Sequence, residues 1–288
     1  MSRIAAVLAF VLVLTGAQAA EPVPSYRVAW NEPSEPFHII GNIYYVGTVE
    51  LAVMLVATPE GHILIDGGMP ESVPQIEKNI AALGFKLSDV KYLLLTHAHF
   101  DHMGGLAQLK RDSGAQLVVS VGDTPYVEQG YKDFGRTAFV KVPPAHVDRQ
   151  IGDGETIELG GVTLTAHLTP GITPGCTSWT MPVTENGVRH EVIFYGSTTL
   201  GGNPLVNNTR YPQIVADYRH SFALLKAIKA DVFLAPHAGF FNAQRKAAQA
   251  KAGEPNPFVV PGELQHFVEG TQRSFEAELA KQQAAAKP

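Results

Sequence analysis

The stretch Tyr92-Leu-Leu-Leu-Thr-His97-Ala-His99-Phe-Asp101-His102-Met-Gly-Gly105 decides how this chain folds. The apolar run at residues 90–95 predicts a buried strand, which ends at a short polar turn. A helical stretch over residues 106–111 follows the turn. The polar residues therefore lie at the C-terminal end of a strand, where α/β proteins place their ligands.

Four of the six residues from His97 to His102 can bind a metal. His97 and His99 alternate, so in an extended segment their side chains point the same way. Asp101 and His102 follow the start of the turn and can face a second point nearby. Imidazole nitrogens and carboxylate oxygens suit zinc, and two neighbouring clusters suit a two-metal hydrolytic site. The alternative is a histidine-rich surface turn, and the density of ligands directly after a strand argues against it.

His-x-His-x-Asp-His after an apolar strand resembles the signature of the metallo-β-lactamase superfamily. Further stretches are similar to the subclass B3 metallo-β-lactamases, and the resemblance runs from about Pro36 to the C-terminus. These stretches are Thr58-Pro-Glu-Gly-His-Ile-Leu-Ile-Asp66-Gly-Gly-Met-Pro70, Thr173-Pro-Gly-Cys-Thr-Ser-Trp179, Arg210-Tyr-Pro212 with Asp217-Tyr-Arg219-His-Ser-Phe222, and Pro236-His237. The signature alone specifies only the superfamily, whereas the signature combined with these further stretches is far more specific.

Meanders of short strands, each followed by helices, occur twice along the chain. This order predicts two packed mixed β-sheets with helices outside, and the resemblance implies the same α+β, αββα sandwich. We expect residues 37–46 to form one strand and Glu185-Asn-Gly187 to be a hairpin turn. Residues 21–36 contain four prolines and predict an irregular arm, whose Trp30 is either a lid over a site or a surface anchor.

The resemblance implies zinc as the cofactor and assigns its ligands. They are His97, His99, Asp101, His102 and His237. His237 follows a strand and would complete one metal site with Asp101 and His102, whereas the alternative is a capped surface histidine. Asp66 also ends a strand and could be a ligand, but the resemblance implies that it holds the loop beneath the metals.

One residue departs from the family pattern. The family's loop reads Gly-His-Thr-Pro-Gly and its histidine completes the first metal site, whereas this chain has Gly171-Ile172-Thr173-Pro174-Gly175. Ile172 cannot bind a metal. Either His167 in the preceding strand or water would then fill the place beside His97 and His99. We expect the site of Asp101, His102 and His237 to bind zinc more strongly than the other.

The resemblance implies zinc-dependent hydrolysis of the β-lactam amide of penicillins, cephalosporins and carbapenems, which gives antibiotic resistance. Asp101 would hold the attacking hydroxide. Ser197 or Thr198 would meet the substrate carboxylate, and the loop at residues 131–147 would form one wall of the groove. Hydroxyacylglutathione hydrolases and lactonases carry a metal-bridging aspartate near residues 197 and 198, where this chain has none. Another metallohydrolase of lactonase or thioesterase type and a degenerate zinc-binding protein remain the alternatives.

The composition is that of an ordinary globular protein. A net charge of −5 over 288 residues gives no reason to expect nucleic acid or an anionic membrane as a partner. We therefore expect a small-molecule substrate. Cys176 is the single cysteine, so an internal disulfide is impossible. We interpret Cys176 as a packed, inert residue rather than as a catalytic thiol.

The N-terminus has the pattern of a signal peptide. Arg3 supplies a positive charge, residues 4–14 are an apolar run, and Ala17-Gln-Ala19 fits a cleavage site. The apolar run is too short to span a bilayer. We expect residues 1–19 to be the signal peptide and residues 20–288 to be a single domain exported to a bacterial periplasm.

We predict that the exported protein begins at Ala20 or Glu21, because the small-residue motif directs cleavage after Ala19 or Ala20. N-terminal sequencing of protein recovered from the periplasm checks this prediction. A periplasmic protein that starts at Met1 would contradict it.

Overall fold

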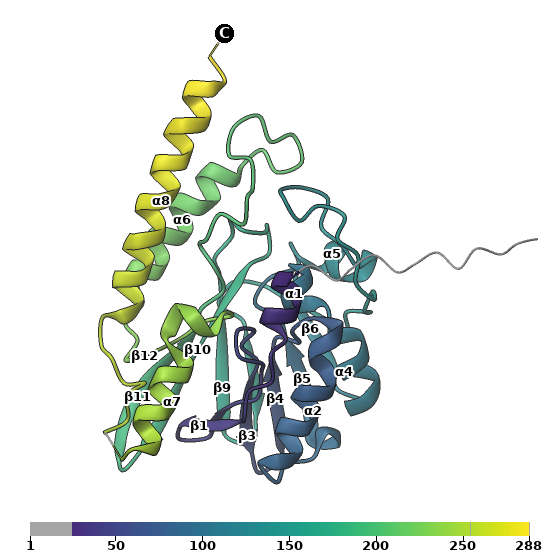
Figure 1. Ribbon diagram of the computed structural model, residues 1–288, viewed down its shortest axis with the longest axis vertical. Coiled ribbons are helices and arrows are strands. Elements are labelled where there is room, and N and C mark those ends of the chain that lie inside the picture. The colour runs from purple at the N-terminus through teal and green to yellow at the C-terminus, as the bar shows by residue number, and fades with distance from the viewer. Residues whose placement is uncertain (1–24, 254, 288) are drawn as a thin grey trace, which may run out of the picture.

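A computed structural model describes residues 25–253 and 255–287 of the chain. Within them two β-sheets pack against each other and helices lie on the outer faces, so the expected αββα sandwich is confirmed (Figure 1). The signal-peptide segment lies outside the described residues. No helix within the described ranges has the length and apolar character needed to cross a bilayer.

The first sheet carries the polar turn that contains His97, His99, Asp101 and His102. Its strands in spatial order are β1 (Phe37–Ile40), β2 (Ile43–Tyr45), β3 (Met54–Thr58), β4 (Gly61–Ile65), β5 (Val90–Leu94), β6 (Gln116–Ser120) and β7 (Arg149–Ile151). The strands from β1 to β4 pair antiparallel, and those from β4 to β7 pair parallel. Parallel neighbours need crossover connections, and each of the three connections contains at least one helix. The C-terminal ends of β4 and β5 therefore meet at one edge.

The second sheet packs against the first and forms the other half of the sandwich. Its spatial order is β12 (Val232–Leu234), β11 (Val188–Phe194), β10 (Thr177–Glu185), β9 (Val162–Leu168) and β8 (Thr156–Leu159). Neighbours pair antiparallel except for β11 and β12, which run parallel. The parallel pairing brings the segment after β12 to the same edge of the sandwich as the ends of β4 and β5.

The helices divide between the two outer faces. On the first sheet lie α2 (Val73–Ala82) and α4 (Leu106–Ser113), and on the second lie α6 (Ile214–Ala227) and α8 (Glu263–Ala285) (Figure 1). The remaining elements are α1 (Ser25–Trp30), η1 (Pro70–Ser72), η2 (Leu87–Asp89), α3 (Phe100–Met103), α5 (Thr124–Gln129), η3 (Ala238–Phe241) and α7 (Ala243–Lys251). Each long helix turns an apolar face toward its sheet, as an amphipathic helix requires.

Two local predictions were wrong. Residues 37–46 form the hairpin of β1 and β2, because Gly41 takes a left-handed φ of 55° and turns the chain. The arm contains α1, in which Tyr26 packs edge-on against Trp30 one helical turn later, at 5.3 Å between ring centroids. The Asn-Gly hairpin is confirmed, since Asn186 and Gly187 have φ of 51° and 79°.

Trp179 links the two sheets beneath the polar turn. Its side chain on β10 is fully buried in the core, and its indole Nε1–H donates a hydrogen bond of 3.3 Å to the carbonyl of Leu95. Leu95 directly follows β5 and precedes Thr96 and His97. The core thus fixes the position of the turn as well as the stability of the sandwich.

We predict that Trp179→Ala lowers the free energy of unfolding by about 3–5 kcal/mol, because it leaves a cavity between the sheets. Trp179→Phe keeps most of the packing but leaves the Leu95 carbonyl without its donor, and should cost about 1–3 kcal/mol. Denaturant unfolding followed by circular dichroism measures both variants. Wild-type midpoints for both would refute this role for Trp179.

Candidate metal centre

A buried carboxylate supports the start of the polar turn. Asp66 directly follows β4, and its Oδ1 and Oδ2 accept hydrogen bonds from the Thr96 backbone N–H and hydroxyl, each at 2.8 Å. Asp66 has a left-handed φ of 65°, which aspartate tolerates better than most residues. Its Oδ2 also lies 3.6 Å from Nδ1 of His102. The structure thus places Asp66 beneath the proposed ligands, with its carboxylate engaged by Thr96.

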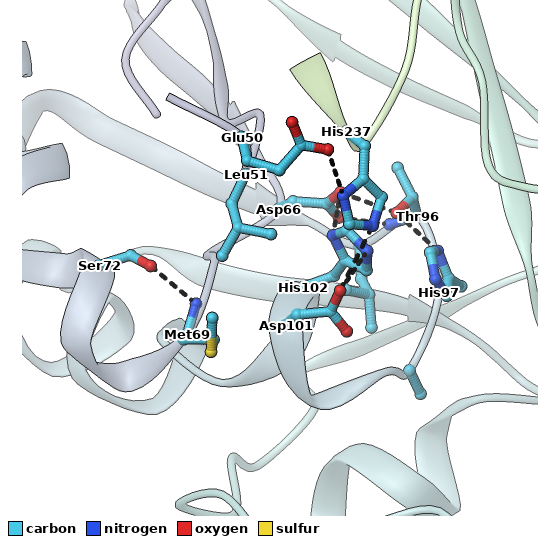
Figure 2. Close-up of polar contacts among 12 residues, drawn as sticks. Glu50, Leu51, Asp66, Met69, Ser72, Thr96, His97, Asp101, His102 and His237 are labelled. Atoms are coloured by element: carbon cyan, nitrogen blue, oxygen red, sulfur yellow. Dashed lines mark hydrogen bonds and ion pairs between the residues drawn. The ribbon is translucent and has the colours of Figure 1, made fainter. Parts of the chain in front are cut away.

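Asp101, His102 and His237 come together at the end of the sandwich. The first two lie on α3 and the third follows β12, yet one candidate ligand atom from each lies within 4.8 Å of the others. Oδ2 of Asp101 is 3.4 Å from Nε2 of His102 and 3.4 Å from Nε2 of His237. Figure 2 shows the three side chains pointing toward one another, with Asp66 behind them. We call these residues the Asp101 trio.

Glu50 orients the third member of the trio. Its Oε1 lies 3.2 Å from Nδ1 of His237 and accepts a hydrogen bond from it (Figure 2). This contact leaves Nε2 of His237 free to face Asp101. A carboxylate behind a histidine is the usual arrangement around metal-binding imidazoles, since it fixes the ring and its tautomer. Sequence reasoning missed this role, because Glu50 lies in an ordinary loop between strands.

The electrostatics of the metal-free trio favour a cation. Burial tends to raise the pKa of Asp101, but His102 and His237 hold it well below its usual range, so the carboxylate is ionised. Burial lowers the pKa of His102 to about 4, which keeps that imidazole neutral. Burial would also lower the pKa of His237, but Asp101 and Glu50 raise it to about 9. A metal would displace the His237 proton and take over its attraction to Asp101.

His97 and His99 form only half of a site. Their ring centroids lie 4.8 Å apart, and burial lowers the pKa of both well below the usual range, with His102 and Lys132 adding to the effect. Nε2 of His99 is buried without a hydrogen-bond partner among the described residues. The Asp101 trio is the only group of three such ligands found within the described part of the chain.

Ile172 lies where a third ligand would be needed. Its side chain is buried, and it shares with His99 the space against Gly201. A Cβ built on Gly201 would lie 2.9 Å from Cε1 of His99 and 3.1 Å from Cδ1 of Ile172. His167, the alternative donor, hydrogen-bonds through Nε2 to the Thr180 hydroxyl at 2.8 Å on β10. It is not among the residues that line the cavity next to His97 and His99. The structure therefore brings no replacement ligand to this half-site.

A second buried carboxylate fixes the Ile172 loop to the polar turn. Asp123 accepts hydrogen bonds from the Ala98 and Gly175 backbone N–H groups and from the Thr173 hydroxyl, at 2.7, 2.8 and 2.7 Å. Ala98 lies between the paired histidines, so the loop and the histidines share one support. Burial raises the pKa of Asp123 to about 6. Sequence reasoning missed this residue, because its three partners belong to distant segments.

A cavity of about 110 Å³ opens above these residues. His97, His99, Asp101 and His237 contribute to its floor, and Trp30 and Phe100 line one side. Trp30 stacks on Phe100 at 6.4 Å and meets His237 edge-on at 5.3 Å between ring centroids. Trp30 is therefore part of the wall of the cavity. This position fits the role of a lid over the site rather than that of a surface anchor alone.

The hydroxyl residues predicted to meet the substrate separate in the structure. Ser197 lines the cavity, as does Thr199, which sequence reasoning did not single out. The Thr198 hydroxyl instead hydrogen-bonds to the hydroxyls of Tyr195 and Thr271, each at 2.6 Å, and does not line the cavity. Backbone alternation explains this difference, because neighbours in an extended segment point to opposite sides.

Cys176 has the environment of a packed residue. It is buried and its Sγ faces the Ser197 carbonyl at 3.6 Å. Burial raises the pKa of the Cys176 thiol far above its usual range. A thiol must ionise to act as a nucleophile, so this environment opposes a catalytic role.

Residues 48–237 match the family model of the Metallo-beta-lactamase superfamily, and the chain belongs to this superfamily. It is a hydrolase of the metallo-β-lactamase type, and its structural neighbours are subclass B3 enzymes. BJP-1 of Bradyrhizobium japonicum, a subclass B3 metallo-β-lactamase, is 46% identical with a TM-score of 0.85, over 90% of this chain and 98% of that chain. FEZ-1 of Legionella gormanii is 41% identical with a TM-score of 0.85, over 88% and 98%.

Curated relatives match over shorter segments. A probable metallo-hydrolase of Burkholderia pseudomallei is 32% identical over 131 residues, which are 44% of this chain and 43% of the relative. A hydroxyacylglutathione hydrolase of Hyphomonas neptunium is 29% identical over 99 residues, 34% of this chain and 32% of the relative. The chain thus spans less than half the length of these relatives, whereas it covers nearly all of the two B3 structures.

The residues present fit the zinc that this family implies. The Asp101 trio offers one carboxylate and two imidazoles, a donor set typical of catalytic zinc. Both ring nitrogens of His102 are buried and lack hydrogen-bond partners in the described structure. Buried imidazole nitrogens without partners are costly, and a metal bound to one of them would remove part of that cost.

Proposed function

We propose that this protein is an exported zinc β-lactamase that hydrolyses the amide of penicillins, cephalosporins and carbapenems and so gives antibiotic resistance. The observation that carries the proposal is the Asp101 trio, of which Asp101 and His237 line a cavity that also presents the hydroxyls of Ser197 and Thr199 and no second acid. The B3 neighbours, which match the chain almost end to end, support the same substrate class. The periplasmic address rests on the N-terminal sequence pattern alone.

Zinc held by Asp101, His102 and His237 would polarise the scissile carbonyl and make a water acidic enough to attack at neutral pH. The Asp101 carboxylate stays ionised, so it can accept a hydrogen bond from that water and orient it. Glu50 fixes the His237 ring, and Asp66 fixes the backbone that carries the turn. Trp30 and Phe100 cover one side of the cavity and reduce its exposure to bulk water.

A covalent route through serine finds no support in the structure. The chain contains one Ser-x-x-Lys sequence of the kind used by serine β-lactamases, Ser88-Asp-Val-Lys91. It lies at the start of β5, the end of the strand away from the metal turn, and Lys91 donates a hydrogen bond to the Ser88 carbonyl. Neither residue lines the cavity.

A second candidate is a thioesterase or lactonase of the same fold, which the similarity to hydroxyacylglutathione hydrolases favours. Such enzymes require the metal-bridging acid, and the residues that line the cavity near positions 197–199 are hydroxyls. The two candidates differ in substrate, so one comparison separates them.

We predict that the zinc-loaded protein turns over nitrocefin and a carbapenem much faster than a lactone or a glutathione thioester. Asp101→Ala and His237→Ala should each lower β-lactam kcat/KM by more than the roughly 10- to 100-fold typical of residues behind the ligands. His220→Ala, an exposed histidine on α6, is the control. Circular dichroism checks that the variants fold. Near-normal turnover in either variant, or faster thioester hydrolysis, would reject the assignment.

We further propose that zinc fills the Asp101 trio first and that the half-site of His97 and His99 binds zinc weakly. A histidine would provide a nitrogen at about 2.0–2.1 Å from zinc, and Ile172 provides none. The buried Lys132 also opposes positive charge at both histidines, as its effect on their pKa values shows. Water would have to complete the coordination shell of a zinc ion bound by His97 and His99.

Titration of the metal-free protein with zinc should therefore show that the first zinc equivalent binds tightly and the second weakly. Activity should rise as zinc is added. Ile172→His should tighten the second equivalent and raise turnover, whereas Ile172→Leu is the matched control and should change neither. Calorimetry and β-lactam hydrolysis provide the two readouts. Two tight, equal equivalents in the parent, unchanged by Ile172→His, would show that another residue completes the site.

A further inference from the structure

A short loop at residues 47–51 holds His237 through both the backbone and a side chain, and we call it the His237 cradle. The Glu50 carbonyl accepts a hydrogen bond of 2.7 Å from the Ala238 backbone N–H. The Glu50 side chain contacts Nδ1 of His237 at 3.2 Å, so Glu50 and Asp101 meet opposite nitrogens of one imidazole ring (Figure 2). The position of the third candidate ligand therefore depends on where the cradle lies.

The Thr48 side chain closes the cradle and joins it to the arm. Thr48 is buried, and its Oγ1 accepts a hydrogen bond of 3.0 Å from the Leu51 backbone N–H, beyond Glu50. The Thr48 backbone N–H donates one of 3.0 Å to the Leu51 carbonyl. The Thr48 hydroxyl also donates a hydrogen bond of 2.5 Å to the Trp30 carbonyl. One side chain thus fixes the segment that carries Glu50 and connects it to the N-terminal arm.

Further hydrogen bonds fasten the arm to the backbone of the cradle. The Val49 N–H donates one of 2.8 Å to the Glu32 carbonyl. Asn79 on α2 is buried, and its Nδ2 donates hydrogen bonds of 3.0 Å to the carbonyls of Ser34 in the arm and Gly47 in the cradle. All of these acceptors are backbone groups. The arm and α2 therefore set the position of the cradle itself, and not only the orientation of its side chains.

The Trp30 ring contacts the metal centre directly. It meets the His237 ring edge-on at 5.3 Å between ring centroids, while the Trp30 carbonyl accepts the hydrogen bond from Thr48. The ring also stacks on Phe100, the residue before Asp101, at 6.4 Å. The arm thus touches the cradle, the third candidate ligand and the helix that carries the other two.

From these contacts we infer that Thr48 and Trp30 are positioning residues through which the N-terminal arm sets the affinity of the Asp101 trio for zinc. Thr48 acts through Glu50, and Trp30 acts on the His237 ring. A ligand that is already held in place loses less conformational freedom when the metal binds, so the complex is more stable. The inference rests on the zinc site of the proposed function and deepens it, because it gives a segment outside the ligand-bearing loops a role in metal binding.

Zinc affinity, measured by competition with a chelator, tests this inference without turnover. Glu50→Ala should weaken binding of the first zinc equivalent about 10- to 100-fold, as is typical of a carboxylate behind a ligand. Thr48→Val keeps the volume of the side chain but loses both hydroxyl hydrogen bonds, so it should weaken binding about tenfold. Thr48→Ser keeps the hydroxyl and should bind zinc like wild type. Trp30→Ala should weaken binding and speed the release of zinc.

A double-mutant cycle separates positioning from a general loss of stability. Because Thr48 acts through Glu50, Thr48→Val should have little further effect on zinc affinity in the Glu50→Ala background. Thr163→Val, at an exposed threonine on β9, is the matched control for Thr48→Val. Val28→Ala, at an exposed residue of α1, is the control for Trp30→Ala. Neither control should change zinc affinity.

Circular dichroism checks that each variant folds. Equal effects of Thr48→Val with and without the Glu50 side chain, or wild-type zinc affinity in Thr48→Val and Trp30→Ala, would overturn the inference. If Thr48→Val does not fold, the half-buried Trp30 provides the deciding variant, and wild-type affinity in Trp30→Ala overturns the inference alone. If wild type binds zinc but hydrolyses no β-lactam, the proposed function fails, and the zinc affinities still decide the role of the arm.

Discussion

The hydrogen bonds from Thr96 to the buried carboxylate of Asp66 are the contact on which the rest of the site depends. They join the ends of β4 and β5 and fix the backbone one residue before His97. Burial raises the pKa of Asp66 to about 7, so the protein spends folding free energy to keep a carboxylate there. Zinc next to His102 would favour the ionised carboxylate, which links the binding of the metal to the support beneath it.

Asp123 supports the Ile172 loop, which departs from the family pattern, in the way that Asp66 supports the polar turn. It binds the backbone of Ala98 and of Gly175, so the Ile172 loop and the paired histidines keep one relative position. These hydrogen bonds hold the loop near the paired histidines, where Ile172 offers no metal ligand.

Charge is distributed unevenly around the cavity. The Asp101 trio combines an ionised carboxylate with two imidazoles and so attracts a cation. Elsewhere around the cavity the charge is positive: the buried Lys132 disfavours further positive charge at His97 and His99, and the exposed Arg136 lines the cavity. Burial lowers the pKa of Lys132 to about 8.

The sequence by itself determined the sandwich, the Asn-Gly hairpin and the four candidate ligands between His97 and His102, and the family resemblance added His237. Strand periodicity, turn chemistry and closely spaced ligands are local properties, so they can be read along the chain. Only the tertiary structure decided that Glu50 orients His237, that Asp123 joins two loops, and that Arg136 and Thr137 share a cavity with Thr199. Each of these relations joins segments far apart in sequence, and packing of the two sheets alone brings them within contact distance.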